Sequence, residues 1–308
     1  IEEYTKAIEL KDNDYISYFY RGDANFQNED YEQAIKDYLK SIDLNPNYPN
    51  SYNNLALVYN TYTKDYLKVI EYYKRAYEIE PKPLNTNNIA IVFGYDLNNY
   101  DSALFYYEKS IDLFPEYDDS YSQKGDFHYN FGEYEQAIEE YTKAIELKDN
   151  DFEIYFDRGD AYSKNEDYEQ AIKDYLKSIE LNPNYADSYN NLALTYNNYT
   201  KDHLKVIEYY KRAYEIEPDP LFLNNIALTY AYDLNIYDSA LFYFEKSVDL
   251  FPEYDDSYFK KGFFHYNFYE YEQAIEEYTK AIELKDNDYK YYFNRGDAFD
   301  EYGMYEEA

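Results

Sequence analysis

The spacing of apolar residues predicts an amphipathic helix that begins after Asp30 and ends before Pro46. Apolar or small side chains recur there at the i, i+3, i+4, i+7 spacing that places them on one face of a helix. That face would be formed by Ala34, Ile35, Tyr38, Ser41 and Ile42. We expect it to pack against neighbouring helices, while the opposite, charged face meets water.

The residues at both ends of this segment support a helix. Asp30 precedes it and Gln33 lies three residues later, so we expect Asp30 to accept from first-turn N–H groups and the Gln33 side chain to return a bond. Pro46 ends the helix because proline lacks the N–H that a helix needs. Its counterparts are Pro81, Pro115, Pro183, Pro218 and Pro252.

Another helix is predicted just before this one, over residues 15–28. It carries Tyr18, Gly22 and Phe26 at helical spacing and ends in the polar run QNED. The two segments form a helix–turn–helix unit that recurs with a period close to 34 residues, the period of helix-pair repeats. Its anchor positions are Ile35, Ile70, Leu104, Ile138, Ile172, Ile207, Leu241 and Ile275.

A longer repeat is superimposed on the short one. The decapeptide IEEYTKAIEL begins at Ile1, Ile138 and Ile275. Residues 1–137 align with residues 138–274 without gaps, and most positions are identical. The chain therefore consists of duplicated blocks over 1–137 and 138–274 and a partial block over 275–308.

These units resemble the tetratricopeptide repeat (TPR) family along the whole chain. One unit fills the family's signature positions with Tyr18, Gly22, Ala34, Tyr38, Ser41 and Pro46, and a later unit fills them with Tyr155, Gly159, Ala171, Tyr175, Ser178 and Pro183. The resemblance implies an all-α fold, a right-handed superhelical α-solenoid of about nine repeats that forms one domain over residues 1–308. Two features depart from the family pattern. The turn between helices is one residue longer in the second and third units of each block, and Val69 and Val206 replace a small alanine.

Neither end of the sequence has the polar capping repeat that a solenoid requires. Residues 1–10 correspond to a second helix without its first, and Ala308 stands where the next second helix should begin. We therefore expect an excerpt of a longer array. An alternative function follows, because uncapped ends that join head to tail would build a filament. Light scattering across a concentration series would detect it.

The composition limits the classes of partner. The chain has 63 acidic and 29 basic residues and a net charge of −34, which repels nucleic acid and anionic membranes and favours basic or neutral proteins. No apolar run approaches the roughly 20 residues that span a bilayer. The absence of cysteine excludes disulfides and thiolate sites.

The resemblance also implies where a partner binds, because in the family the residue after the packing glycine faces a concave groove. Acidic and apolar residues alternate at this position: Asp23, Leu57, Ile91, Asp126, Asp160, Leu194, Leu228, Phe263 and Asp297. Together with the many tyrosines, they predict an acidic, aromatic-rich groove that grips a basic peptide. The alternative is a solvated face on a chain that is acidic everywhere.

A series of asparagines is implied to face the same groove. They stand two residues before the small packing residue, at Asn54, Asn88, Asn191, Asn225 and Asn294. Some long members of the family use such a ladder to hold an extended peptide backbone, since a carboxamide both donates and accepts hydrogen bonds. The series is interrupted by Tyr20, Gln123, Asp157 and Lys260.

Three Arg-Gly-Asp tripeptides, at residues 21–23, 158–160 and 295–297, raise the hypothesis of an adhesion protein. The glycine lies where helices of the family pack closely, so packing explains the tripeptide better. We expect the Arg21 stem to pack and its guanidinium to pair with an acidic neighbour.

No catalytic residue, metal site or cofactor is predicted. The DND runs that begin at Asp12, Asp149 and Asp286 lack the glycine and the glutamate of a calcium loop. His128 and His265 occupy a place where the family keeps an aromatic packing residue. We therefore predict a non-enzymatic scaffold that binds a protein segment. A catalytic domain elsewhere in a longer chain is compatible with this prediction.

Overall fold

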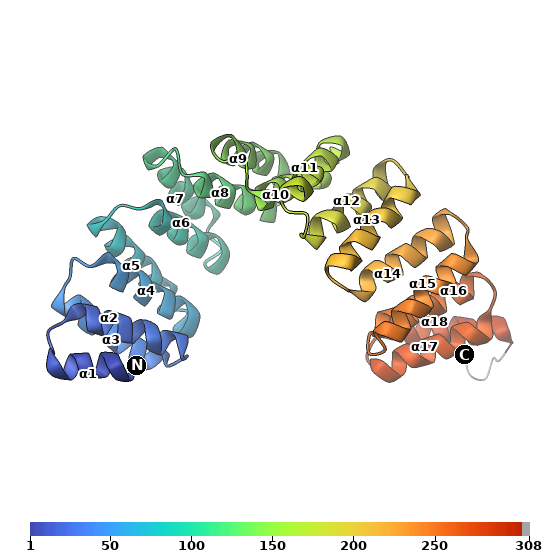
Figure 1. Ribbon diagram of the computed structural model, residues 1–308, viewed down its shortest axis with the longest axis horizontal. Helices are drawn as coiled ribbons and strands as arrows, with labels where there is room; N and C mark the ends of the chain where they lie inside the picture. The colour runs from blue at the N-terminus through green and yellow to red at the C-terminus, as the bar shows by residue number, and fades with distance from the viewer. Residues whose placement is uncertain (304–308) are drawn as a thin grey trace. The chain divides into compact units, whose positions relative to one another are not determined.

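The computed structural model describes residues 1–303, and the prediction of an all-α fold is confirmed over this range. It contains 18 α-helices and three short π-helical turns, joined by tight connections (Figure 1). The expected start of a further helix near Ala308 lies outside the described residues. Two compact units meet at the Asn150/Asp151 junction, and each is described separately below.

The first unit consists of one lone helix and four helix pairs. The lone helix is α1 (Glu2–Leu10). The first helices of the pairs are α2 (Tyr15–Gln27), α4 (Pro49–Val58), α6 (Pro83–Ile91) and α8 (Asp118–Asn130). The second helices are α3 (Tyr31–Leu44), α5 (Tyr66–Ile79), α7 (Tyr100–Leu113) and α9 (Tyr134–Leu147).

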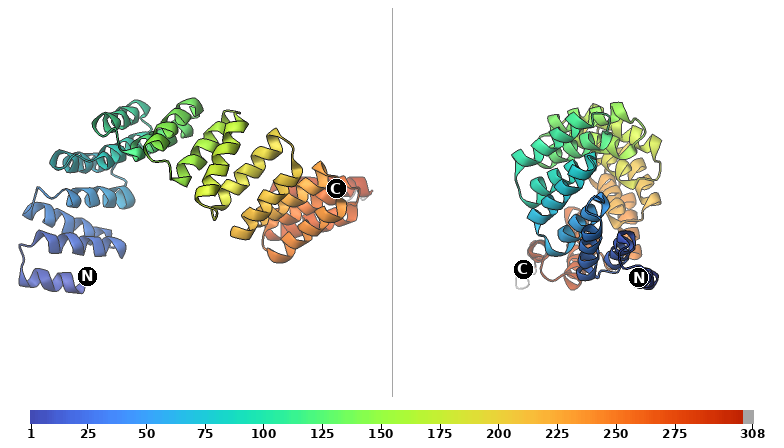
Figure 2. Two further views of the ribbon diagram at one scale, coloured as in Figure 1. Left: turned by 45° about the horizontal axis from the view of Figure 1, so that its top comes forward. Right: turned by 90° about the vertical axis from the view of Figure 1, so that its left-hand side faces the viewer.

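The second unit continues the same alternation. Its first helices are α10 (Phe152–Lys164), α12 (Ala186–Tyr199), α14 (Pro220–Leu228), α16 (Asp255–Asn267) and α18 (Tyr289–Tyr302). Its second helices are α11 (Tyr168–Leu181), α13 (His203–Ile216), α15 (Tyr237–Leu250) and α17 (Tyr271–Leu284). Each first helix from α2 to α16 lies against the second helix that follows it (Figures 1 and 2).

The helix N-termini confirm one half of the predicted capping. The Asp30 carboxylate accepts from the Gln33 backbone N–H at 3.2 Å, and Asp65, Asn99, Asp167 and Asp202 cap their helices in the same way. The other half is wrong. The Gln33 side chain donates to Asp37 Oδ1 at 3.0 Å instead of returning to the cap, because that carboxylate lies one turn along the same face.

In three of the four longer units the extra residue lies in a helix and not in a loop. It forms a π-helical turn at the end of the first helix, at Tyr59–Thr63, Val92–Asp96 and Thr229–Asp233. In the fourth, α12 stays α-helical to Tyr199. The i→i+5 bond of the first turn joins Lys64 N–H to Tyr59 C=O at 2.8 Å. A single-residue insertion is therefore absorbed without breaking the helix.

The glycine of the Arg-Gly-Asp tripeptide packs as predicted. A Cβ added at Gly22 would lie 2.8 Å from Cε1 of the Tyr38 ring, and one at Gly159 would lie 2.9 Å from Cε1 of Tyr175. These distances are shorter than carbon contacts in folded proteins, so a larger residue here would force the tyrosine ring or the two helices to shift.

The arginine of the tripeptide forms the predicted ion pair. Nε and Nη2 of Arg21 donate to both carboxylate oxygens of Asp37, at 2.9 and 2.7 Å. Arg158 and Asp174 repeat this bidentate arrangement in the second unit. All of these side chains are mostly buried. Arg21 and Arg158 therefore join the two helices of a repeat and are not presented to a receptor, whereas Arg295 donates to Thr279 Oγ1 of the preceding repeat at 3.1 Å.

The two histidines are buried as expected, but they also bond. His128 Nδ1 lies 2.6 Å from Glu133 Oε2, which also accepts from the Tyr100 hydroxyl at 2.6 Å. The Tyr100 hydroxyl, together with His128, lowers the pKa of Glu133. His265, Glu270 and Tyr237 form the same cluster in the second unit. These clusters fasten the turn between helices of one repeat to the preceding repeat.

Candidate functional site

The predicted acid and asparagine positions meet in both units. Asp23 on α2 accepts from the Tyr38 hydroxyl at 2.6 Å and from Asn54 Nδ2 of the next repeat at 2.7 Å. Asp160 on α10 accepts in the same way from Tyr175 at 2.5 Å and from Asn191 at 2.7 Å. Aspartates and asparagines of the two predicted series thus form acid–amide pairs across successive first helices.

Both bonds in each pair end on the same carboxylate oxygen, Oδ1. Among the described residues, neither Asp23 nor Asp160 forms an ion pair. The arrangement fixes the orientation of each carboxylate and leaves the lone pairs of Oδ2 for another donor. An anionic group held in place in this way is suited to bind a cation.

Asp126 on α8 has a tyrosine partner but no asparagine partner. It accepts from the Tyr141 hydroxyl at 2.8 Å, and the Asn130 side chain bonds the backbone C=O of Asp126 at 2.8 Å and the Tyr95 hydroxyl at 3.0 Å. Burial raises the pKa of Asp126 and that of Asp160. Water therefore stabilises these two carboxylate charges poorly. A cation of a binding partner would stabilise them better.

The remaining acid position, Asp297 on α18, is exposed. Leu57 and Leu194 are 42% and 43% exposed, one helical turn beyond Asn54 and Asn191. In each unit the first helices therefore carry an acid–amide pair and, one turn further along, a solvent-exposed leucine. We name this surface the first-helix face.

Asn88 and Asn225 differ from Asn54 and Asn191 in their partners. All four are half-buried, but the preceding repeat offers Leu57 or Leu194 where Asn54 and Asn191 find an aspartate. The Asn225 side chain lies near the Tyr210 hydroxyl instead. The four asparagines thus have two kinds of surroundings. The sequence distinguishes the two kinds. The residue 31 positions before Asn54 and Asn191 is an aspartate, whereas the residue 31 positions before Asn88 and Asn225 is a leucine.

The chain contains a natural test of the aspartate–tyrosine bond. Phe263 stands at the position equivalent to Asp126, so the buried Tyr278 hydroxyl has no hydrogen-bond partner in the described structure. We expect Tyr141→Phe to lower the free energy of unfolding by about 1 kcal/mol, because it removes a satisfied bond. Tyr278→Phe should leave it unchanged or raise it. Urea titrations of the two variants compare them, and equal losses would show that the bond to Asp126 contributes nothing.

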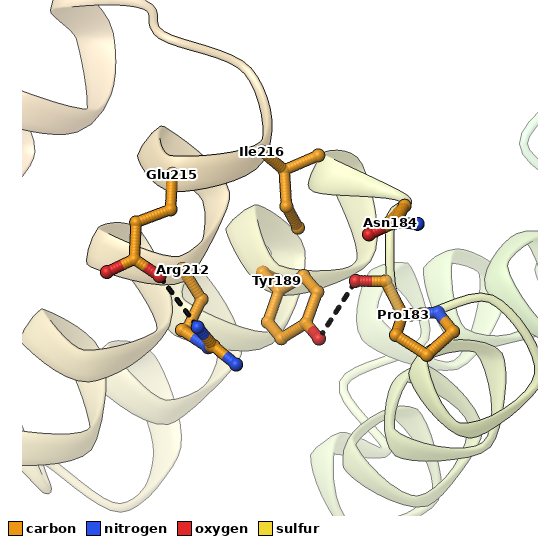
Figure 3. A pocket seen from close by; sticks show the side chains of 6 residues that line it. All are labelled: Pro183, Asn184, Tyr189, Arg212, Glu215 and Ile216. Carbon is orange, nitrogen blue, oxygen red and sulfur yellow. Dashed lines mark hydrogen bonds and ion pairs between the residues drawn. The ribbon is translucent and has the colours of Figure 1, made fainter.

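A cleft of about 640 Å³ lies away from these residues, at a turn between repeats of the second unit (Figure 3). Tyr189 and Ile216 form its apolar wall, and the Tyr189 hydroxyl donates to the Pro183 C=O at 3.2 Å. Arg212 pairs with Glu215 at 2.7 Å at its rim. Sequence reasoning missed it, although the run KRAYEIEP occurs in both blocks.

No helix within residues 1–303 combines the length and the apolarity needed to cross a membrane.

Sequence models of one protein family match this chain. The model described as "TPR repeat" matches residues 22–61, 125–166 and 159–198, and the model described as "Tetratricopeptide repeat" matches residues 49–83, 87–117, 186–220 and 255–288. No curated protein matches the chain.

Solved structures show the same fold. The MamA protein is 27% identical over 55% of this chain and 93% of its own, with a TM-score of 0.50. The C-terminal part of a TPR repeat-containing protein from Cytophaga hutchinsonii is 19% identical over 90% of this chain and 98% of its own, with a TM-score of 0.55. A chain of the APC/C hetero-tetramer Cut9–Hcn1 is 16% identical over 96% of this chain and 58% of its own, with a TM-score of 0.52. The repeat matches, the helix pairs and the packing glycines agree, and the chain belongs to the tetratricopeptide repeat family.

Proposed function

We propose that the first-helix face of each unit binds an extended, basic segment of a partner protein. TPR proteins generally mediate protein–protein interactions and are generally non-enzymatic scaffolds. The proposal adds which face binds and which charge the partner carries.

The acid–amide pairs are the observation that carries this proposal. Tyr38 and Asn54 hold the Asp23 carboxylate through one oxygen, and Tyr175 and Asn191 hold Asp160 in the same way. Lysine and arginine donate hydrogen bonds without accepting any, so they suit the oxygen that is not engaged. A carboxylate that is already oriented loses little entropy when it binds.

The apolar neighbours support binding of a protein segment over binding of a free cation. Leu57 and Leu194 are exposed one helical turn from the amide of each pair. A peptide that places a basic side chain at the carboxylate can cover these leucines with the next apolar side chain. The net charge of −34 would steer such a segment towards the chain.

Carboxylate-to-amide variants test the proposal. The probe is a fluorescein-labelled peptide of alternating arginine and serine, and its partner peptide carries citrulline, which has nearly the shape of arginine without its charge. We expect Asp23→Asn and Asp160→Asn each to weaken binding of the arginine peptide by about three- to tenfold. An Asn Oδ1 can still accept the bonds from tyrosine and asparagine, so the fold is kept.

Fluorescence anisotropy gives the dissociation constants. The exposed Asp43, which pairs with Lys40 on a second helix, provides the matched control, and Asp43→Asn should bind as the wild type does. Equal weakening by Asp43→Asn would mean that only the total charge matters, and the proposed face would then be wrong.

Stability and binding should respond in opposite directions to Asp126→Asn. Burial raises the pKa of Asp126 above its ordinary value, so the folded chain holds the proton more tightly than the unfolded chain does. The wild type therefore loses stability as the pH rises through the window between the unfolded and the folded pKa. Asp126→Asn should therefore be more stable than the wild type at pH 7 and should have no such advantage at about pH 3. It should also bind the arginine peptide more weakly than the wild type does. Denaturant titrations at both pH values measure this, and a variant less stable at pH 7 would contradict the assignment.

A further inference from the structure

One corner of the second unit brings three tyrosine rings together. Tyr266 lies at the end of α16, Tyr269 in the turn, and Tyr271 at the start of α17. The Tyr266 and Tyr271 rings are 5.6 Å apart at 65°, and those of Tyr269 and Tyr271 are 6.3 Å apart at 90°. Edge-to-face rings present both faces and edges to whatever approaches them.

Tyr269 is held in an unfavourable and exposed position. Its φ is 62°, in the left-handed region, and its side chain is 80% exposed. The equivalent residue of the first block is Gly132, with a φ of 78°, and glycine adopts this conformation without strain. The second block thus has a bulky exposed ring where the fold itself favours glycine. The left-handed conformation belongs to the turn, since Glu29 and Glu166 also adopt a φ of 62° in other repeats, so the exposed ring is what distinguishes the second block.

Carboxylates of α18 lie near the rings. The charge of Glu301 acts on Tyr271, and the charges of Glu301, Asp297 and Asp300 act on Tyr266. On α10 the positions equivalent to Asp300 and Glu301 hold Ser163 and Lys164. In two nearly identical copies, the differences at this corner therefore add one ring and two acids. We name Tyr266, Tyr269, Tyr271, Asp297, Asp300 and Glu301 the acidic–aromatic corner.

Cations of the chain itself lie over other tyrosines but not over these. Lys68 lies 4.7 Å from the Tyr59 ring centroid, and Lys205 lies 4.8 Å from that of Tyr196. Within residues 1–303 no lysine or arginine lies over the three rings of the corner. Their faces and the adjacent carboxylates share one preference, for a positive charge.

We propose that the acidic–aromatic corner binds an arginine or lysine side chain of the basic partner segment, with the Tyr269 ring against the cation and the α18 carboxylates beside it. The inference rests on the proposed function, since it names a contact of the same segment at one end of the second unit. It assigns a specificity role to residues that neither the repeat packing nor the acid–amide pairs use.

The first experiment replaces Tyr269 with the residue of the first block. Tyr269→Gly should weaken binding of the arginine peptide about two- to fivefold, the effect of an exposed cation–π contact, and should not lower the melting temperature, because it relieves a left-handed tyrosine. Tyr269→Phe keeps the ring and should bind as the wild type does. If the Tyr269 ring had only a structural role, Tyr269→Gly would instead have a lower melting temperature than the wild type and the same affinity for the arginine peptide.

The second experiment exchanges the acids for their counterparts on α10. Asp300→Ser combined with Glu301→Lys should weaken binding of the arginine peptide and reduce its dependence on salt. The citrulline peptide should bind each variant and the wild type equally.

These measurements separate the two proposals. If Tyr269→Gly and the α18 double variant bind normally while Asp23→Asn and Asp160→Asn bind weakly, the corner proposal is overturned and the proposed function stands. If the wild type binds the arginine and citrulline peptides equally, both are overturned.

Discussion

Asp37→Ala is expected to lower the free energy of unfolding by about 3–5 kcal/mol, the cost of leaving one partner of a buried ion pair without the other. The Asp37 side chain is 2% exposed and that of Arg21 is 16% exposed. The carboxylate accepts two bonds from Arg21, one from Gln33 and one from the buried Asn25 at 3.0 Å. In the alanine variant, the N–H groups of Arg21, Asn25 and Gln33 that bond Asp37 would lose their acceptor.

Two controls separate this effect from a general loss of charge. Asp43→Ala removes an exposed carboxylate that pairs with Lys40, and it should change the free energy by less than about 0.5 kcal/mol. The double variant Arg21→Met with Asp37→Leu should recover most of the loss, because it removes the uncompensated charge as well. Urea unfolding followed by circular dichroism measures all three. A loss below about 1 kcal/mol for Asp37→Ala would show that the pair does not hold the repeat together.

Asn85→Phe should raise the free energy of unfolding by about 2 kcal/mol. Asn85 is 1% exposed, and neither its Oδ1 nor its Nδ2 has a hydrogen-bond partner in the described structure. Each such group costs about 1–3 kcal/mol. The second block has already made this exchange, because Phe222 stands at the equivalent place, 6% exposed within an apolar cluster that includes Tyr189 and Ile226. The new ring adds apolar burial, part of which is offset by crowding.

The reciprocal substitution provides the control. Phe222→Asn should destabilise the second unit by more than Asn85→Phe stabilises the first, since it creates both a cavity and two unpaired polar atoms. Melting curves and urea titrations report both. If Asn85→Phe were destabilising, the two blocks would differ in packing around this site despite their similar sequences.

The helices and their packing could be predicted from the sequence because they depend on local periodicity. The i, i+3, i+4, i+7 pattern placed the second helix of the first repeat between Asp30 and Pro46, and the structure has it at Tyr31–Leu44. The close approach at Gly22 and the pairing of Arg21 were also predicted, since duplicated copies repeat both features. Local and global preferences agree in these repeats.

Other features depend on which side chains meet in space. The Gln33 side chain was expected to complete a capping box, but the nearer Asp37 competes for it. Three of the four longer turns expected from the sequence are π-helical turns, because a helix can absorb one residue and keep its bonds. The pairing of Asp23 with Asn54 spans two repeats. The acidic–aromatic corner depends on the conformation of Tyr269, which no apolar pattern reveals.

The central claim is that carboxylates of the first-helix face bind the cations of a partner segment. The affinity of the wild-type chain for the arginine and citrulline peptides, measured by anisotropy from about 50 to 300 mM salt, tests it most directly. We predict that the arginine peptide binds more tightly at every salt concentration and that its advantage shrinks as the salt rises. Equal binding of the two peptides, or an advantage that salt does not reduce, would contradict the claim.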